Sequence, residues 1–277
     1  MKKFRILFAL VALVLILATC LTSCEYLDDI IDIAKDLEQG LEDFKEILSE
    51  LENIESNVPD DSTVDPEQNV NIPSVGLDCI PEFSDVPYVK INDDIPFFTP
   101  DEIVSESYEL YYEQDKLGRC TLTIACIGPD LMPTDDRGSI GQVKPSGWQS
   151  VKYDIVDGKY LYNRCHLIGF QLTGENANVN NLITGTRYLN VIGMLPFEDM
   201  VADYIKETEN HVMYRVTPIY EGDELVARGV LMEGWSVEDN GEGICFCIYA
   251  YNNQPGVIIN YADGTSALDP NYEPTKN

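Results

Sequence analysis

Hydrophobic positions between residues 26 and 56 recur at alternating spacings of three and four, and acidic residues occupy most of the remaining faces. The apolar positions are Leu27, Ile30, Ala34, Leu37, Leu41, Phe44, Leu48 and Leu51. Such a heptad seam is typical of a coiled coil or of a helix that lies on another surface. We therefore expect a helical stalk over residues 25–56. Self-association through the seam is one interpretation, and a solvated single helix is the other.

The pattern changes after the stalk. Residues 57–76 lose periodicity and contain Pro59, Pro66 and Pro73 among Asp, Asn and Ser, which is typical of a linker. Residues 77–264 hold strand-like and helix-like stretches and are predicted to form the folded domain. Residues 265–277 have the composition of a loose tail.

The folded domain is predicted to contain several strands and few helices. The expected strands are 121–127, 151–155, 159–162, 212–220, 225–233 and 244–251, with Asp157-Gly158 and Glu221-Gly222-Asp223 as turns. The expected helices are 180–191 and 196–208. This combination predicts an α+β domain around one mixed, mainly antiparallel sheet, preceded by the helical stalk.

Residues 1–24 have the pattern of an export signal. The first residues are basic, residues 4–17 are mostly apolar, and the run ends in Leu21-Thr22-Ser23-Cys24. This ending resembles a bacterial lipoprotein box. It implies lipidation of Cys24 and a chain anchored at the extracellular face of the bacterial membrane. A cleaved signal with secretion, or a plain membrane anchor, is the alternative.

Export also determines how the cysteines are interpreted, because disulfides form in oxidising environments outside the cytosol. Beyond Cys24 the sequence holds an even number of cysteines: Cys79, Cys120, Cys126, Cys165, Cys245 and Cys247. Six cysteines allow 15 pairings. Disulfides and buried free thiols are both compatible with the sequence.

The charge of the chain argues against a nucleic-acid partner at first sight. The formal net charge is −30, from 48 acidic and 18 basic residues, whereas phosphate binding usually requires a basic surface. The acid is concentrated in the flanks: residues 25–76 hold 16 acidic and 2 basic residues, but residues 120–190 hold 6 of each. The neutral middle permits a local cationic groove. No base-reading motif accompanies it, so sequence-specific recognition is not expected.

The residues around position 166 suit phosphodiester hydrolysis. Asn163-Arg164-Cys165-His166 is preceded by an arginine and followed by two asparagines, an arginine and a glutamate: Arg137, Asn181, Asn190, Arg187 and Glu198. Hydrolysis needs a base for water, a cation near phosphorus and help for the departing oxygen. Histidine titrates near neutral pH, amide oxygens suit hard cations, and the arginine fork matches phosphate.

Each of these residues taken alone has a simpler structural interpretation. A single histidine in a hairpin is usually structural, asparagines are more often caps and turn residues, and a helical glutamate is usually solvated. The ordered set on a hairpin followed by a helix favours chemistry. By contrast, we interpret His211 as a surface residue, and Lys144 with Trp148 as part of a packed turn.

This ordered set resembles the DNA/RNA non-specific endonucleases of the ββα-metal (His-Me finger) class, in particular the secreted streptococcal and pneumococcal nucleases. The match is good over residues 130–200 and loose over the rest of the domain. The resemblance implies that His166 is the general base. It also implies that Asn190 holds one divalent metal, Mg²⁺ or alternatively Mn²⁺, and that Glu198 steadies metal-bound water.

The same resemblance assigns the remaining polar residues to the substrate and the site. Arg137 and Arg164 would contact the scissile phosphate. Asn181 and Arg187 would orient the site or contact phosphate. DNA and RNA are therefore the expected substrates.

Two positions depart from the family motif. Asn163 stands where the family usually has Asp, which is expected to lower activity without abolishing it. Cys165 stands where the family has Gly, and a disulfide is one interpretation of it. The predicted function is that of a membrane-anchored, non-specific endonuclease. The alternatives are a degenerate nucleic-acid-binding lipoprotein without catalysis and a surface interaction protein that acts through its heptad stalk.

Overall fold

The computed structural model describes residues 75–273. The predicted export signal with Cys24, the heptad stalk and the linker up to residue 74 lie outside the described residues. Among residues 75–273, no helix has both the length and the apolar character needed to cross a membrane.

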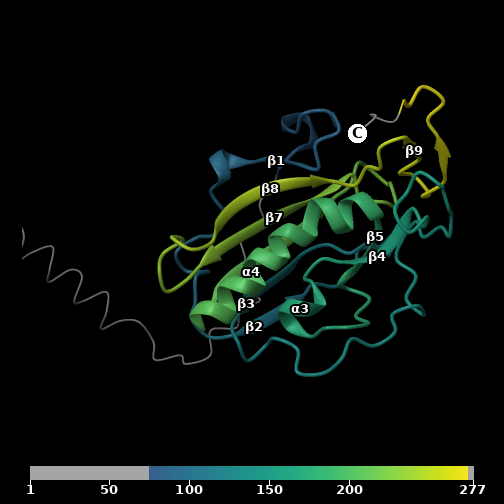
Figure 1. Cartoon of the computed structure of the whole chain (residues 1–277). Helices are drawn as coiled ribbons and strands as arrows, with labels where there is room; N and C mark the ends of the chain where they lie inside the picture. The colour runs from purple at the N-terminus through teal and green to yellow at the C-terminus, as the bar shows by residue number, and fades with distance from the viewer. Residues whose placement is uncertain (1–74, 274–277) are drawn as a thin grey trace, which may run out of the picture. The chain divides into compact units, whose positions relative to one another are not determined.

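A six-stranded sheet forms the centre of the domain (Figure 1). Its strand order is β1-β8-β7-β6-β3-β2, and every neighbouring pair is antiparallel. The strands are β1 (Tyr88–Lys90), β2 (Tyr108–Tyr111), β3 (Thr123–Ile127), β6 (Val212–Ile219), β7 (Gly229–Ser236) and β8 (Cys245–Tyr251). The expectation of an α+β domain on a mainly antiparallel sheet is confirmed.

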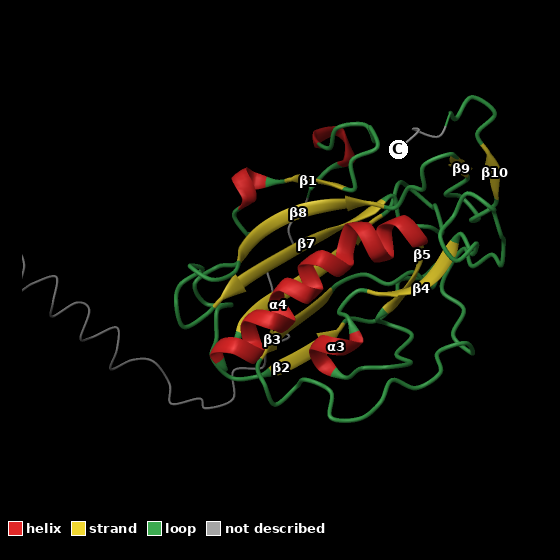
Figure 2. Cartoon of the chain, viewed as in Figure 1, coloured by secondary structure: helices red, strands yellow, loops and turns green. Residues whose placement is uncertain are grey.

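Smaller elements surround this sheet (Figure 2). Two antiparallel ribbons are formed by β4 (Tyr162–His166) with β5 (Leu182–Thr186), and by β9 (Val257–Ile259) with β10 (Ser266–Leu268). The helical elements are η3 (Leu77–Cys79), η4 (Asn92–Asp94), α3 (Phe170–Thr173), the π-helical η5 (Leu189–Met194) and α4 (Leu195–Thr208). β10 extends the ordered domain into the segment expected to be a tail.

Helix α4 lies across one face of the sheet (Figure 1). Pro196 occupies its first turn, where a missing N–H costs nothing. Val201, Ala202 and Ile205 are completely buried at helical spacing, and they share one core cluster with residues of β3, β6, β7 and β8. Beyond Thr208, Glu209 adopts a left-handed conformation (φ 59°) and ends the helix. The main core is therefore the layer between α4 and the sheet.

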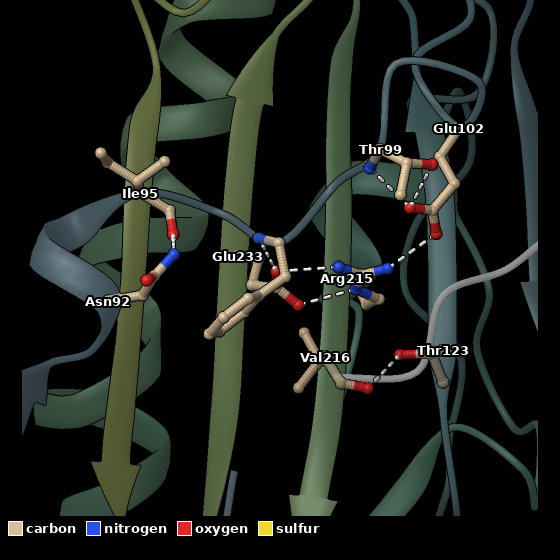
Figure 3. Close-up of polar contacts among 9 residues, drawn as sticks. Asn92, Ile95, Thr99, Glu102, Thr123, Arg215, Val216 and Glu233 are labelled. Carbon is tan, nitrogen blue, oxygen red and sulfur yellow. Dashed lines mark hydrogen bonds and ion pairs between the residues drawn. The ribbon is translucent and has the colours of Figure 1, made fainter. Parts of the chain in front are cut away.

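The opposite face of the sheet is covered by the connection between β1 and β2, and a buried ion network fastens it there (Figure 3). The guanidinium of Arg215 is fully buried, with Nε 2.7 Å from Glu233 Oε2 and Nη1 2.8 Å from Glu102 Oε1. Glu233 Oε1 accepts a hydrogen bond from the Phe97 backbone N–H at 2.7 Å. Likewise, Glu102 Oε2 accepts a hydrogen bond from the Thr99 backbone N–H at 2.8 Å. The network ties the covering segment to β6 and β7.

The structure corrects the helix expected over residues 180–191. Residues Leu182–Thr186 form strand β5, and helical structure begins only at residue 187, with the π-helical η5 from Leu189. The stretch is rich in β-branched residues, which favour strands. All residues of β5 are buried because neighbouring elements cover both of its faces. Continuous burial gives no alternation from which a strand could be recognised.

The hairpin expected around Asp157-Gly158 forms only in part. Only one bridge joins its two arms, between Lys152 and Tyr160. Successive turns interrupt it, because Val156 N–H donates to Tyr153 O and Lys159 N–H donates to Val156 O. The strand that follows pairs with β5 instead.

The expected strand 225–233 begins later, at Gly229. Leu225 and Val226 donate their N–H groups to Tyr261 O instead of to a neighbouring strand of the large sheet.

Arg215→Met should lower the free energy of unfolding by about 3–5 kcal/mol, because it leaves two buried carboxylates without their cation. Lys206→Met is the matched control. Its ion pair with Asp203 is exposed and 3.7 Å long, so its loss should cost less than about 1 kcal/mol. Urea unfolding of both variants measures the difference. Equal stability losses would contradict a special role for the buried network.

Candidate active site

The residues singled out in the sequence meet in a unit of two strands and a helix. Strand β4 ends at His166, which lies opposite Leu182 of β5. After β5, the chain continues through η5, which carries Asn190, into α4, whose first turn carries Glu198. The sequence analysis placed a hairpin before the histidine, whereas His166 ends the first strand of the β4–β5 ribbon and the helix follows the second strand.

The two faces of strand β4 have different surroundings. Cys165 is completely buried in the main core cluster. Successive side chains of a strand point to opposite faces, so Arg164 and His166 lie on the other face. Loop 141–149 covers this second face, because Arg164 donates to Gly141 O and Thr184 donates to Ser146 O.

The ring of His166 is held at both nitrogens. Nε2 lies 2.8 Å from the backbone oxygen of Asn176, and Nδ1 lies 3.2 Å from Nη2 of Arg137. A carbonyl oxygen can only accept, so Nε2 carries the proton and Nδ1 offers a lone pair. Burial lowers the pKa of His166 to about 4, the Asn176 hydrogen bond opposes this shift, and the Arg137 charge adds to it. His166 is therefore neutral near pH 7.

Glu198 is a second titratable group near Arg137. Its carboxylate packs against Gly169, where a Cβ atom would lie 2.5 Å from Oε2, so a larger residue would collide with it. Burial raises the pKa of Glu198 to about 8; Asp199 raises it further and Arg137 lowers it. The charge of Arg137 thus acts on both the neutral His166 imidazole and the buried Glu198 carboxyl group.

Asn190 lies in the π-helical segment, where its backbone oxygen accepts the N–H of Leu195. Its side-chain Oδ1 accepts a hydrogen bond from Cys165 Sγ at 3.0 Å. An amide oxygen has two acceptor positions, so one remains for another partner. π-Helical turns often occur at functional sites because they place a side chain out of the regular helical register.

Cys165 fills the space between β4, β5 and η5. Gly185 of β5 makes room for it, because a Cβ atom there would lie 2.6 Å from the Cβ of Cys165. Burial raises the pKa of its thiol well above the ordinary value, so the group stays a protonated donor. All six cysteines of residues 75–273 are free. The disulfide interpretation of Cys165 was therefore wrong.

The other residues expected at the site make structural contacts. Asn181 is buried and ties the 167–181 connection together, with Oδ1 accepting Ile168 N–H and Nδ2 donating to Ile168 O, both at 2.9 Å. Arg164 also donates to Val143 O and stacks on Trp148, with Cζ 4.1 Å from the ring centroid. Arg187 pairs with Asp157 at 2.8 Å.

Sequence reasoning missed Asn176, which holds the histidine ring through its backbone carbonyl. Every residue has a carbonyl, so no residue-type signal marks this role. His211 is partly exposed and its Nδ1 lies 2.6 Å from Oε1 of Glu238. Trp148 does pack in a turn, against Arg164, whereas Lys144 is exposed.

No group of three or more His, Cys, Asp or Glu side chains among residues 75–273 is arranged to hold a metal ion. This excludes a cage of such ligands within that part of the chain. The donor set still fits a hard cation held by one amide oxygen, that of Asn190, because Mg²⁺ commonly keeps several waters and few protein ligands.

The buried, neutral state of His166 predicts a specific titration. Its imidazole should stay neutral as the pH falls from 7 and become protonated only near pH 4, below its ordinary value of 6.5. Between these values the unfolded chain binds more protons than the folded one, so the contribution of His166 to stability falls as the pH falls. Imidazole NMR measures this titration, and His166→Ala assigns the two histidines. A His166 inflection near pH 6.5 would contradict the buried site.

Comparisons with known proteins match this domain with nucleases. Residues 101–237 match the DNA/RNA non-specific endonuclease family. A deoxyribonuclease of Streptococcus dysgalactiae subsp. equisimilis is 33% identical over 111 residues, which are 38% of this chain and 32% of that protein. The chain thus spans about a third of the length of this relative.

Solved structures show the same fold. NucA of Streptococcus agalactiae with magnesium bound is 22% identical, with a TM-score of 0.56, and the match covers 67% of this chain and 91% of NucA. Sda1 nuclease with a bound zinc ion is 26% identical, with a TM-score of 0.57, and covers 66% of this chain and 97% of Sda1. Residues 101–237 therefore resemble the DNA/RNA non-specific endonuclease family, and the domain has the fold of streptococcal nucleases.

Proposed function

We propose that this protein hydrolyses phosphodiester bonds in DNA and RNA without sequence preference, by the ββα-metal (His-Me finger) mechanism. The observation that carries the proposal is the state of His166. Its Nε2–H donates to Asn176 O, and its unprotonated Nδ1 accepts from the Arg137 guanidinium. A neutral imidazole with a lone pair beside a phosphate-binding group is what activation of water at phosphorus requires.

His166 is the general base in this mechanism. Its Nδ1 takes the proton of the attacking water, while Asn176 O holds the ring and accepts from the imidazolium that forms. In the free protein, Arg137 donates to the same Nδ1. A bound phosphate offers the guanidinium a stronger, charged acceptor. Substrate binding would therefore draw Arg137 away from Nδ1 and free the base.

Neutralisation of Arg137 by phosphate also strengthens the base. The Arg137 charge lowers the pKa of His166 in the free protein. When a phosphate group compensates that charge, the imidazolium becomes less unfavourable and Nδ1 accepts the proton more readily. Arg137 would then both position the scissile group and tune His166.

Asn190 and Glu198 complete the site. The Oδ1 of Asn190 would hold a divalent cation such as Mg²⁺ or Mn²⁺, which supplies charge stabilisation at phosphorus and at the departing 3′-oxygen when bound. NucA with magnesium and Sda1 with zinc support a divalent metal in this fold. Glu198 would orient water near Asn190 through its carboxylate. A bound cation favours the charged form of this buried acid.

The test is degradation of plasmid DNA and of RNA by the purified protein with Mg²⁺, with Mn²⁺ and with EDTA. His166→Ala should reduce the rate by at least ~10²-fold, since general base catalysis contributes that much or more. His211→Ala is the matched control and should retain full activity, because His211 pairs with Glu238 outside the site. Asn190→Ala should raise the Mg²⁺ concentration needed for half-maximal rate.

Intact nucleic acid in every metal condition, from a folded protein, would overturn the proposal. Binding without cleavage would then identify a degenerate nucleic-acid-binding lipoprotein. Its motivation is Asn163, which replaces the motif Asp and whose Nδ2 is buried without a hydrogen-bond partner among the described residues. Absence of binding would leave a surface interaction protein that acts through its stalk.

We further propose that the protein is exported and anchored through a lipid on Cys24, an inference that rests on the sequence of residues 1–24 alone. Cys24→Ala should release the protein from the membrane fraction and abolish incorporation of a fatty-acid label. Cys20→Ala is the matched control and should change neither. A membrane-bound Cys24→Ala protein would show that another anchor is responsible.

A further inference from the structure

Acidic residues outnumber basic residues in the described domain, yet the cations are unevenly neutralised. Seven of its basic side chains form ion pairs with carboxylates: Lys90, Arg119, Lys159, Arg187, Lys206, Arg215 and Arg228. The others make no carboxylate ion pair within residues 75–273: Lys116, Arg137, Lys144, Lys152 and Arg164. Except for Lys116, all of these lie in the segment 137–164 that leads to His166.

The acids of this segment are already compensated. Asp154 is paired with Lys159 at 2.9 Å, and Asp157 with Arg187 at 2.8 Å. Segment 137–164 contains no other acidic residue. Its remaining cations therefore form a local positive excess within a strongly acidic domain.

Loop 141–149 is fixed on the face of β4 that carries His166. Arg164 Nη2 donates to Gly141 O at 2.8 Å, and Thr184 Oγ1 donates to Ser146 O at 2.8 Å. Lys144 lies on this fixed loop, and its side chain is exposed. The loop thus holds an available cation on the catalytic side of the ribbon.

Lys152 extends the cations away from the base. It bridges to Tyr160, and its Nζ lies 4.3 Å from the centroid of that ring, which is half exposed. Tyr160 stands six residues before His166, at most roughly 20 Å along an extended chain. One strand of duplex DNA presents about six phosphates over such a length, at roughly 3.4 Å each.

Acidic residues line a hollow beside the site. The hollow has a volume of about 460 Å³, lies next to Asn176 and Gly138, and includes Asp130, Asp135 and Asp136 in its lining. No lysine or arginine lines it. Like charges repel, so a polyanion bound at Arg137 and His166 is disfavoured in this hollow and favoured along segment 137–164, where the uncompensated cations lie.

We propose that the nucleic-acid backbone runs from Arg137 over loop 141–149 to Lys152, with Lys144 and Lys152 binding phosphates that flank the scissile bond. This inference rests on the proposed function, because it assigns the path of the same substrate. The contacts are to phosphate, so affinity depends on charge and salt and not on base sequence.

The test measures binding apart from cleavage. The full chain with His166→Ala binds a fluorescein-labelled DNA duplex of mixed sequence, and anisotropy gives the Kd at several NaCl concentrations. Lys144→Gln with Lys152→Gln should raise the Kd severalfold and reduce the slope of log K against log salt by about 2, one for each lost phosphate contact. Lys116→Gln is the matched control, because Lys116 is exposed and forms no carboxylate pair among the described residues. It should change neither quantity.

Equal behaviour of the lysine pair and of Lys116→Gln, in proteins with unchanged melting temperature, would overturn the path. An unchanged salt slope despite weaker binding would also overturn it. Cleavage by the protein with His166 intact reports separately on the proposed function. If both lysines contribute to salt-dependent binding but the protein does not cleave, the proposed nuclease activity is wrong and the proposed path of the nucleic acid is supported.

Discussion

The alternation of side chains between the two faces of strand β4 is the constraint on which the rest of the site depends. Its alternation sends Cys165 into the core and His166 to the opposite face, and pairing with β5 fixes that register. A slip by one residue would exchange the faces, burying the imidazole under α4 and exposing the thiol. The core therefore selects which side chain reaches the site. Packing against α4 holds Cys165 in the core, and β4 in turn holds the His166 imidazole in place.

The same geometry positions the helix that carries Asn190 and Glu198. Cys165 Sγ contacts Asn190 Oδ1 at 3.0 Å and Met194 Sδ at 3.4 Å, so the strand and the π-helical turn meet through this one side chain. Gly169 lets the connection after β4 approach the Glu198 carboxylate closely. The side chains of Asn190 and Glu198 thus rest directly against the main core cluster or the turn beside it. This explains how neutral His166 and a carboxyl with a raised pKa lie near the same exposed arginine.

The charges of the domain are distributed unevenly. A domain with many more acids than bases would repel a polyanion if its charges were spread evenly. Most of its cations form ion pairs with carboxylates. Arg215 is buried between Glu102 and Glu233, on the face of the sheet opposite α4. Four of the five remaining cations lie in the segment 137–164 that leads to His166. Net charge therefore describes the solubility of this protein better than the field at its site.

Sequence patterns identified the longer elements. β6, β8 and α4 lie close to their expected bounds, because the two strands are long runs of strand-forming residues and the helix has apolar residues at helical spacing. β5 was assigned to a helix, since a strand buried on both faces has no alternation to show. β1 and β2 are edge strands of three or four residues and gave no signal. Arg137, His166, Asn190 and Glu198 were chosen from their order along the chain. The contacts of Arg164 and Arg187 depend on loops whose course the sequence pattern does not reveal.

The two departures from the family motif take a structural meaning from the same alternation. Asn163 and Cys165 lie on the same face of β4, opposite to the face that carries Arg164 and His166. Asn163 stands opposite Gly185 in the ribbon, and Gly185 also leaves the space that the Cys165 thiol fills. A residue larger than glycine at 165 thus depends on the absence of a side chain at 185. The thiol at 165 and the glycine at 185 therefore fit each other, and the same thiol reaches Asn190 on the core side of the strand.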